Sequence, residues 1–174
     1  MNSEKFQFLL GHVALHRVIP VRIDFTLSPT FEPFQIEPAY TRVNWATGDI
    51  HVAEMELETP EGPQQVNLMR FHVTTRTRLV RVGEGGVPPD SQEPEESNVW
   101  MDATVEFMLE YGLRGCKHED LDQDAISEFS AKNVPHNMWP YFREMVQNLA
   151  TRAQLPIPTI PPFRIPTTHQ PASK

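Results

Sequence analysis

The sequence predicts an α+β domain: a four-stranded antiparallel sheet followed by C-terminal helices that pack on one side of it. Three observations support this prediction. Proline and glycine turns separate extended stretches in the first half of the chain, a long apolar–polar alternation follows, and the apolar spacing then becomes helical. Strands followed by helices are typical of the α+β class. The 174 residues fit a single domain over 1–166, with a flexible tail at 167–174.

The first three strands are predicted at 11–28, 39–59 and 64–82. In the first, every odd position from 21 to 27 is apolar, which indicates a strand with one buried face. The second and third are separated by the turn at 60–63, so they form an antiparallel hairpin. Placing the polar side chains of the hairpin on one face puts Glu54 near Arg70.

The fourth strand gives the clearest pattern in the chain, over residues 98–114. Its odd positions form an unbroken apolar row from Val99 to Leu113, and its even positions are mainly polar. A strand this long would extend roughly 50 Å, so we expect its far end to meet another element or subunit. Residues 83–98, which precede it, lack periodicity and are predicted to form a mobile loop.

Two helices are predicted after the strands, at 120–131 and 138–153. The second has apolar residues at helical spacing, and Pro140 is expected in its first turn because proline interrupts a helix interior. The amphipathic stripe of this helix is a candidate oligomer interface, with Phe142, Met145, Val146 and Leu149.

Composition excludes several classes of function. A net charge of −8 disfavours nucleic-acid binding, and no apolar run approaches the ~20 residues of a membrane span. Cys116 is the only cysteine and no signal-peptide pattern is present, so a reducing cytoplasm is the expected location. The Cys116 and His118 pair is too small a set for a zinc site. We expect no catalytic residues, no metal and no cofactor.

Two proline-rich segments carry large apolar side chains that a solvated loop would not need. One is the loop at 29–38, and the other begins at residue 155. Such segments could line a groove for extended peptides or cover the core of the domain itself, and the two roles are compatible. The predicted client-binding residues are Phe31, Phe34, Ile36, Trp139, Leu155 and Ile157.

An acidic row on the fourth strand is a second candidate surface. Asp102, Glu106 and Glu110 could present a negative surface to a basic partner. The alternative is a solvated sheet face in which the arginines of the neighbouring strand pair with these carboxylates, and this alternative is favoured.

The C-terminal region resembles the SecB family. The stretch 137–144 (NMWPYFRE) is similar to the helix-opening signature of that family, in which an aromatic residue precedes Pro-Tyr and Arg-Glu comes two residues after it. Thr151-Arg152 and Leu155-Pro156 then resemble the helix end of the family, and Ile160-Pro161-Pro162-Phe163 its apolar-proline segment. Ile23-Asp24-Phe25 with Pro29 and Phe34 resembles its first strand and crossover loop, and Tyr111-Gly112-Leu113 the end of its last strand.

The resemblance implies an ATP-independent chaperone, or holdase, that binds unfolded or precursor polypeptides and assembles as a dimer of dimers. It implies SecA or an antitoxin as a further partner. Where export members carry the acidic residues that help to dock SecA, this chain has Arg22 and Thr26, and it lacks the long C-terminal helix of the family. Two alternatives remain open, which are a chaperone dedicated to one partner such as an antitoxin and a small-ligand-binding or enzymatic α+β domain.

Overall fold

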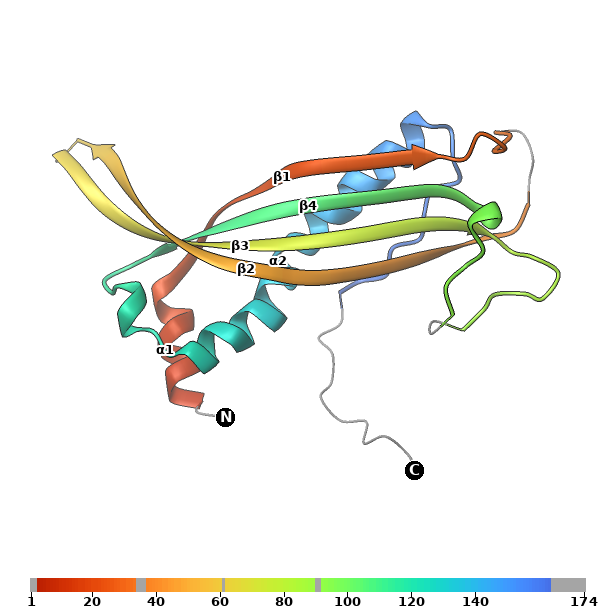
Figure 1. Ribbon diagram of the computed structural model, residues 1–174. Helices are drawn as coiled ribbons and strands as arrows, with labels where there is room; N and C mark the ends of the chain where they lie inside the picture. The colour runs from red at the N-terminus through yellow and green to blue at the C-terminus, as the bar shows by residue number, and fades with distance from the viewer. Residues whose placement is uncertain (1–2, 34–36, 61, 90–91, 164–174) are drawn as a thin grey trace, which may run out of the picture.

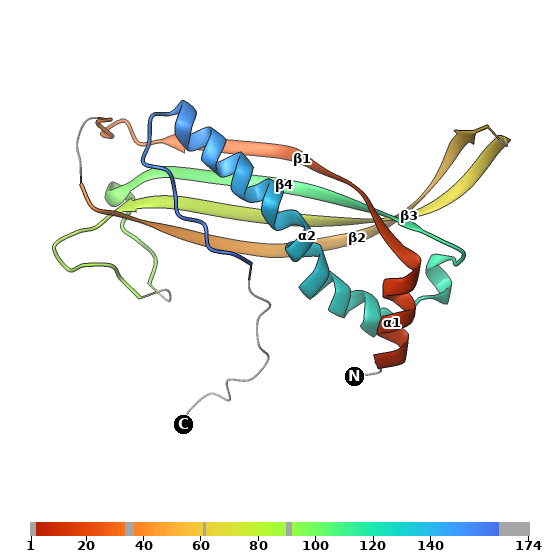
Figure 2. The same ribbon diagram turned by 180° about the vertical axis from the view of Figure 1, so that it is seen from behind.

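A long, twisted sheet forms one layer of the molecule, and helix α2 (Gln123–Arg152) lies diagonally across one of its faces (Figures 1 and 2). The computed structural model describes residues 3–33, 37–60, 62–89 and 92–163. Its strands are β1 (Val13–Leu27), β2 (Ala39–Thr59), β3 (Gly62–Arg81) and β4 (Val99–Leu113). Helix α1 (Ser3–His12) precedes β1, and short 3₁₀ helices at Glu96–Asn98 and His118–Asp120 flank β4.

The sheet has the order β1-β4-β3-β2, and every neighbouring pair is antiparallel. The predicted fold class is therefore confirmed. The hairpin register differs from the expectation, because Arg70 lies opposite His51 and Glu54 lies opposite Asn67. The strands continue to Thr59 and resume at Gly62, so the turn is shorter than the predicted 60–63, and this shifts the pairing. A bulge between Thr47 and Ile50 changes the register only farther from the turn.

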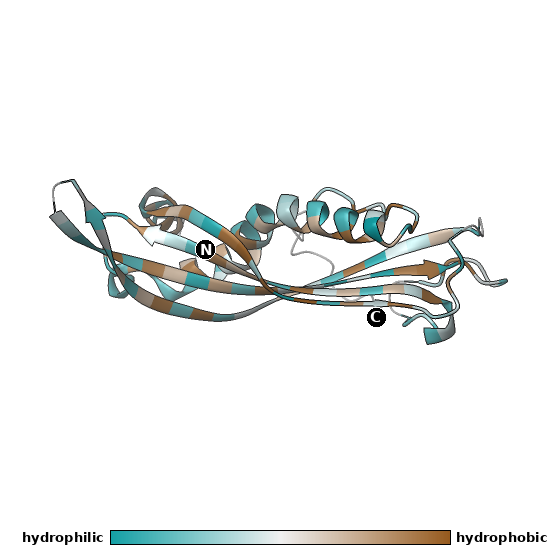
Figure 3. Ribbon diagram, turned by 90° about the horizontal axis from the view of Figure 1, so that it is seen from above, coloured by the Kyte–Doolittle hydropathy of each residue, from teal (hydrophilic) through white to brown (hydrophobic). Residues whose placement is uncertain are grey.

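The two faces of the sheet differ in composition. We call the face that α2 covers the inner face; it carries the odd-numbered residues of β3 and β4 from Met69 to Leu79 and from Met101 to Leu113. Most of these side chains are buried and apolar, as the alternation in the sequence predicts. The opposite, outer face carries the even-numbered residues, which include arginines, carboxylates and His72. Figure 3 shows the helix and the sheet as two layers in contact on one side only.

Helix α2 is one element, although the sequence predicts two helices with Pro140 in the first turn of the second. Pro135 and Pro140 both lie inside it. Each proline removes a helical hydrogen bond at a cost of about 3 kcal/mol. Burial against the inner face offsets that cost, because Phe129, Met138 and Phe142 are all at most 2% exposed. Tertiary packing thus overrides the local helix-breaking signal.

Helix α1 lies where no helix is predicted, and it takes His12 from the start of the expected first strand. Its Leu9 is fully buried in the core. The Lys5 ammonium pairs at 2.6 Å with Asp122, whose other carboxylate oxygen accepts the backbone N–H of Ala125 and caps α2. The signal for α1 is weak in the sequence because its stabilising contacts are with α2, far along the chain.

Candidate functional site

An extended segment follows α2 and lies against the inner face. This segment, residues 155–163, is called the strap; it passes beside α2 and across the strands toward β2 (Figure 2). The side chains of Leu155, Pro158 and Ile160 are buried, whereas Ile157 is 64% exposed. The strap therefore buries a few spaced side chains on the inner face and leaves the others in solvent, as a bound extended peptide would.

The far end of the strap lies in an aromatic cluster between β2 and α2. The Phe163 ring centroid is 5.7 Å from that of Trp45 on β2, 5.3 Å from Trp139 and 6.1 Å from His136 on α2. The Trp139 indole N–H donates to the Pro161 carbonyl at 2.7 Å. These contacts join β2 to α2 through the strap.

The beginning of the strap is set by the end of α2. Gln154 has a left-handed φ of 57°. Its N–H donates to the Thr151 carbonyl, and the N–H of Leu155 donates to the Ala150 carbonyl at 3.0 Å. This is a Schellman motif, which ends the helix and turns the chain back toward the sheet.

Beyond Leu155 the strap has little polar attachment. Among the described residues, no backbone–backbone hydrogen bond reaches 156–163, and the Trp139 indole supplies its one side-chain hydrogen bond. Four of these eight residues are proline and have no N–H to donate. The strap is therefore held almost entirely by apolar contacts.

The predicted acidic surface is instead a set of ion pairs on the outer face. Glu110 is fully buried and accepts hydrogen bonds from Arg17 at 2.8 Å and Arg70 at 2.7 Å. Burial alone would raise the pKa of Glu110, but the hydrogen bonds and charges of the two arginines together lower it below its usual range. The prediction of a free acidic surface is wrong for Glu110 because its carboxylate is enclosed by arginines. Asp102 pairs with Arg76, and Glu106 contacts His72 at 3.2 Å.

The edge strand β1 leaves apolar side chains in contact with solvent. Leu15, Ile23 and Leu27 are between 37% and 43% exposed. In the ladder they lie opposite Tyr111, Val105 and Met101 of β4, so they belong to the inner face. This strand is a sheet edge, with unpaired backbone groups along one side.

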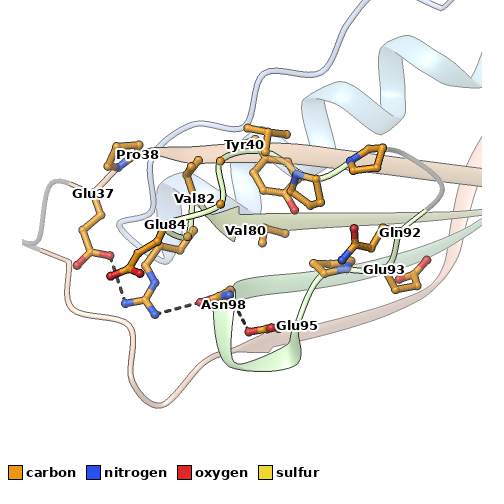
Figure 4. A pocket seen from close by; sticks show the side chains of 18 residues that line it. Glu37, Pro38, Tyr40, Val80, Val82, Glu84, Gln92, Glu93, Glu95 and Asn98 are labelled. Atoms are coloured by element: carbon orange, nitrogen blue, oxygen red, sulfur yellow. Dashed lines mark hydrogen bonds and ion pairs between the residues drawn. The ribbon is translucent and has the colours of Figure 1, made fainter.

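A cavity of about 960 Å³ lies at the end of the sheet where β2 begins and β3 ends (Figure 4). Its walls include Glu37, Glu84, Glu93 and Glu95. Arg81 pairs with Glu37 and also donates to Asn98. The lining is acidic and partly self-paired, so it does not match an apolar ligand.

The residues between β3 and β4, predicted as a mobile loop, are attached to the sheet by two buried arginines. Arg42 donates to the backbone carbonyls of Pro89 and Gln92. Arg78 pairs with Glu93 at 2.5 Å. The composition of the segment did not indicate these contacts, because the arginines lie on other strands.

The predicted client-binding residues do not form one exposed surface. Trp139 and Leu155 are buried within the chain, because the strap covers the indole and Leu155 itself packs inward. They line no open groove while the strap is seated, and their role in client binding stays a prediction. Phe31 is half-buried, with its ring centroid 5.4 Å from Trp100. Ile157 is exposed. Phe34 and Ile36 lie outside the described residues.

The residues of the predicted oligomer interface also differ in their burial. Phe142 and Val146 are fully buried in the core of the chain, so their prediction as interface residues is wrong. They face the sheet because the apolar stripe of α2 covers the inner face. Met145 and Leu149 are half-buried.

Trp45 was missed as a site residue, and Phe163 was noted only as part of the proline-rich segment that begins at residue 155. Trp45 stands in a strand with few other aromatic residues, and Phe163 follows two prolines. The sequence therefore offers only a weak signal for each residue: a tryptophan on a strand with few aromatic residues, and a phenylalanine at the end of a proline-rich stretch. Their contact joins residues 118 positions apart, which no local pattern indicates.

The described residues offer little for catalysis or metal binding. Burial raises the pKa of the Cys116 thiol, and the charge of Asp120 raises it further, so the thiol stays protonated at neutral pH. In the described ranges, no group of three or more His, Cys, Asp or Glu side chains could hold a metal ion. No helix in the same part of the chain is long and apolar enough to cross a membrane.

Comparisons with known proteins agree with this geometry at the level of the fold. No family model matches the sequence, and no curated protein matches it. Among solved structures, the SecB-like chaperone Rv1957 of Mycobacterium tuberculosis, in complex with a ChAD peptide from the Rv1956 HigA1 antitoxin, matches with a TM-score of 0.59. The two are 14% identical, and the match covers 95% of this chain and 100% of that one. The chain described here therefore has a SecB-like fold.

Proposed function

We propose that this chain is an ATP-independent molecular chaperone that holds extended apolar segments of non-native polypeptides against the inner face of its sheet. One observation carries the proposal: an extended apolar segment, the strap, is already seated there with almost no backbone hydrogen bonds. A surface that accepts a chain through side chains alone can accept many sequences, because apolar burial is not directional. Each buried apolar area contributes at about 25 cal/mol per Å², less the cost of ordering the client.

The proposal includes a homo-oligomer, formed by pairing β1 with the β1 strand of a second copy. The half-exposed Leu15, Ile23 and Leu27 would be buried in that contact, and the unpaired backbone edge would gain partners. Ile23→Lys should lower the solution mass measured by light scattering. Thr26→Lys is the matched control, because Thr26 lies on the outer face of the same strand, opposite Asp102. Equal masses for both variants would exclude this interface.

The decisive experiment for the function measures solution mass with and without a reduced, unfolded client protein, together with the aggregation of that client. We expect an oligomer that takes up the unfolded protein and delays its aggregation without nucleotide. The same protein in its native state is the control and should not be bound. A monomer that ignores the unfolded client would overturn the proposal and favour a small-ligand-binding domain.

A chaperone dedicated to one partner is the second candidate. The observation that favours it is the structural neighbour, which is described in complex with a peptide from an antitoxin. The aggregation assay separates the two candidates when several unrelated clients are used. A general holdase protects all of them, whereas a dedicated chaperone protects none of them.

A further inference from the structure

We infer that the strap is a built-in competitor, which occupies the peptide site of the inner face and must leave when a client segment binds. The inference rests on the proposed function and adds its regulation and the kind of segment that fits. The strap is the occupant that the structure shows, so it indicates what the site accepts. Its inward side chains are Leu155, Pro158, Ile160 and the half-buried Phe163, within nine extended residues.

The contacts of the strap can be replaced by those of a client. Among the described residues, 156–163 make no backbone–backbone hydrogen bond, so detachment of this stretch breaks no ladder. The hydrogen bond from the Trp139 indole N–H to the Pro161 carbonyl can be replaced by one to a backbone carbonyl of the client. Phe163 sits between Trp45 and Trp139, where another aromatic or aliphatic side chain could pack. A client segment with similar apolar spacing therefore offers equivalent contacts.

The attachment of the strap allows it to move away without unfolding the helix. The Schellman motif at Gln154 and Leu155 satisfies the last carbonyls of α2 before the proline-rich stretch begins. Detachment from Pro156 onward leaves these bonds in place. If the strap is seated for roughly nine-tenths of the time, it lowers the apparent client affinity about tenfold.

The test uses the 174-residue chain and a fluorescein-labelled nonapeptide that has the sequence of residues 155–163 (LPIPTIPPF). Ile160→Asp should expel the strap, because it places a carboxylate at a position that is 3% exposed. Thr159→Asp places the same carboxylate on the exposed side of the strap and is the matched control. By fluorescence anisotropy, Ile160→Asp should bind the nonapeptide about tenfold more tightly than the unmodified chain, and Thr159→Asp should equal the unmodified chain.

Unchanged or weaker binding by Ile160→Asp would overturn the inference, and so would an equal effect of both substitutions. Thermal unfolding checks that the variants are folded, and a chain ending at Leu155, which keeps the Schellman motif, provides a second way to remove the strap, with the same expected gain. An unfolded client protein, tested beside the nonapeptide, separates the two proposals. If all chains bind the unfolded protein equally well, the strap inference fails and the proposed function stands. If no chain binds it, the proposed function fails, whatever the nonapeptide shows.

Discussion

The two faces of the sheet are stabilised by different forces. The inner face is apolar and is covered by α2 and the strap, whereas the outer face carries Glu110, Asp102 and their arginine partners in ion pairs. Paired charges leave the outer face little to offer an apolar segment. The inner face depends on burial, which any apolar chain of suitable shape can supply. The difference indicates which side of the sheet is suited to bind a polypeptide.

The largest expected effect comes from comparing α2 with the strap, the two segments that cover the inner face. Phe142→Ala in α2 removes a fully buried ring and should lower the free energy of unfolding by about 3–5 kcal/mol. Ile160→Ala in the strap should lower the free energy of unfolding by less than about 2 kcal/mol. A segment that can detach by itself cannot lose more stability than the free energy with which it binds the inner face. Urea unfolding measures both. Equal costs would mean that the strap unfolds only with the whole domain.

The next effect concerns the outer face. Glu110→Gln should lower the free energy of unfolding by about 1–3 kcal/mol at neutral pH, because two charge-assisted hydrogen bonds to a buried carboxylate are weakened. Asp102→Asn is the control. Its pair with Arg76 is partly exposed, so the loss should stay below about 1 kcal/mol.

Glu110→Gln should also change how the free energy of unfolding depends on pH. The folded-state pKa of Glu110 is lowered, so its stabilisation is present above the ordinary glutamate pKa of about 4.3 and is lost as the pH falls through the lowered value. Unfolding at a series of pH values should show a smaller acid loss in Glu110→Gln than in the unmodified chain. Parallel curves would mean that the buried carboxylate does not control acid stability.

The smallest expected effect concerns Thr77, a polar residue on the otherwise mainly apolar inner face. Thr77→Val replaces an unpaired buried hydroxyl with a methyl group and should raise the free energy of unfolding by up to about 1 kcal/mol. Thr75→Val is the matched control, because the Thr75 hydroxyl donates to the Val105 carbonyl at 3.0 Å; its loss should cost about 0.5–1.5 kcal/mol. Differential scanning calorimetry measures both. A destabilising Thr77→Val would mean that this hydroxyl has a partner in solution.

The sequence by itself determined the strands, the inner row of β4 and the α+β order of elements. These depend on periodicity between near neighbours, and the alternation from Val99 to Leu113 settled which side of β4 is buried. Motif resemblance around Trp139 indicated a SecB-like fold, and the structure agrees with it. The candidate site was located only in outline, as two proline-rich segments with apolar side chains.

Only the tertiary structure decided how those apolar side chains are used. Trp139 and Leu155 are both apolar in proline-rich surroundings. The sequence does not distinguish residues that are exposed for client binding from residues that are buried within the chain itself. The same limit applies to Glu110, because the arginines that pair with it lie on β1 and β3. It also applies to Pro140, which lies inside α2 because that helix is buried against the sheet. In each case the deciding contact joins distant parts of the chain, and its energy exceeds the local preference that the sequence displays.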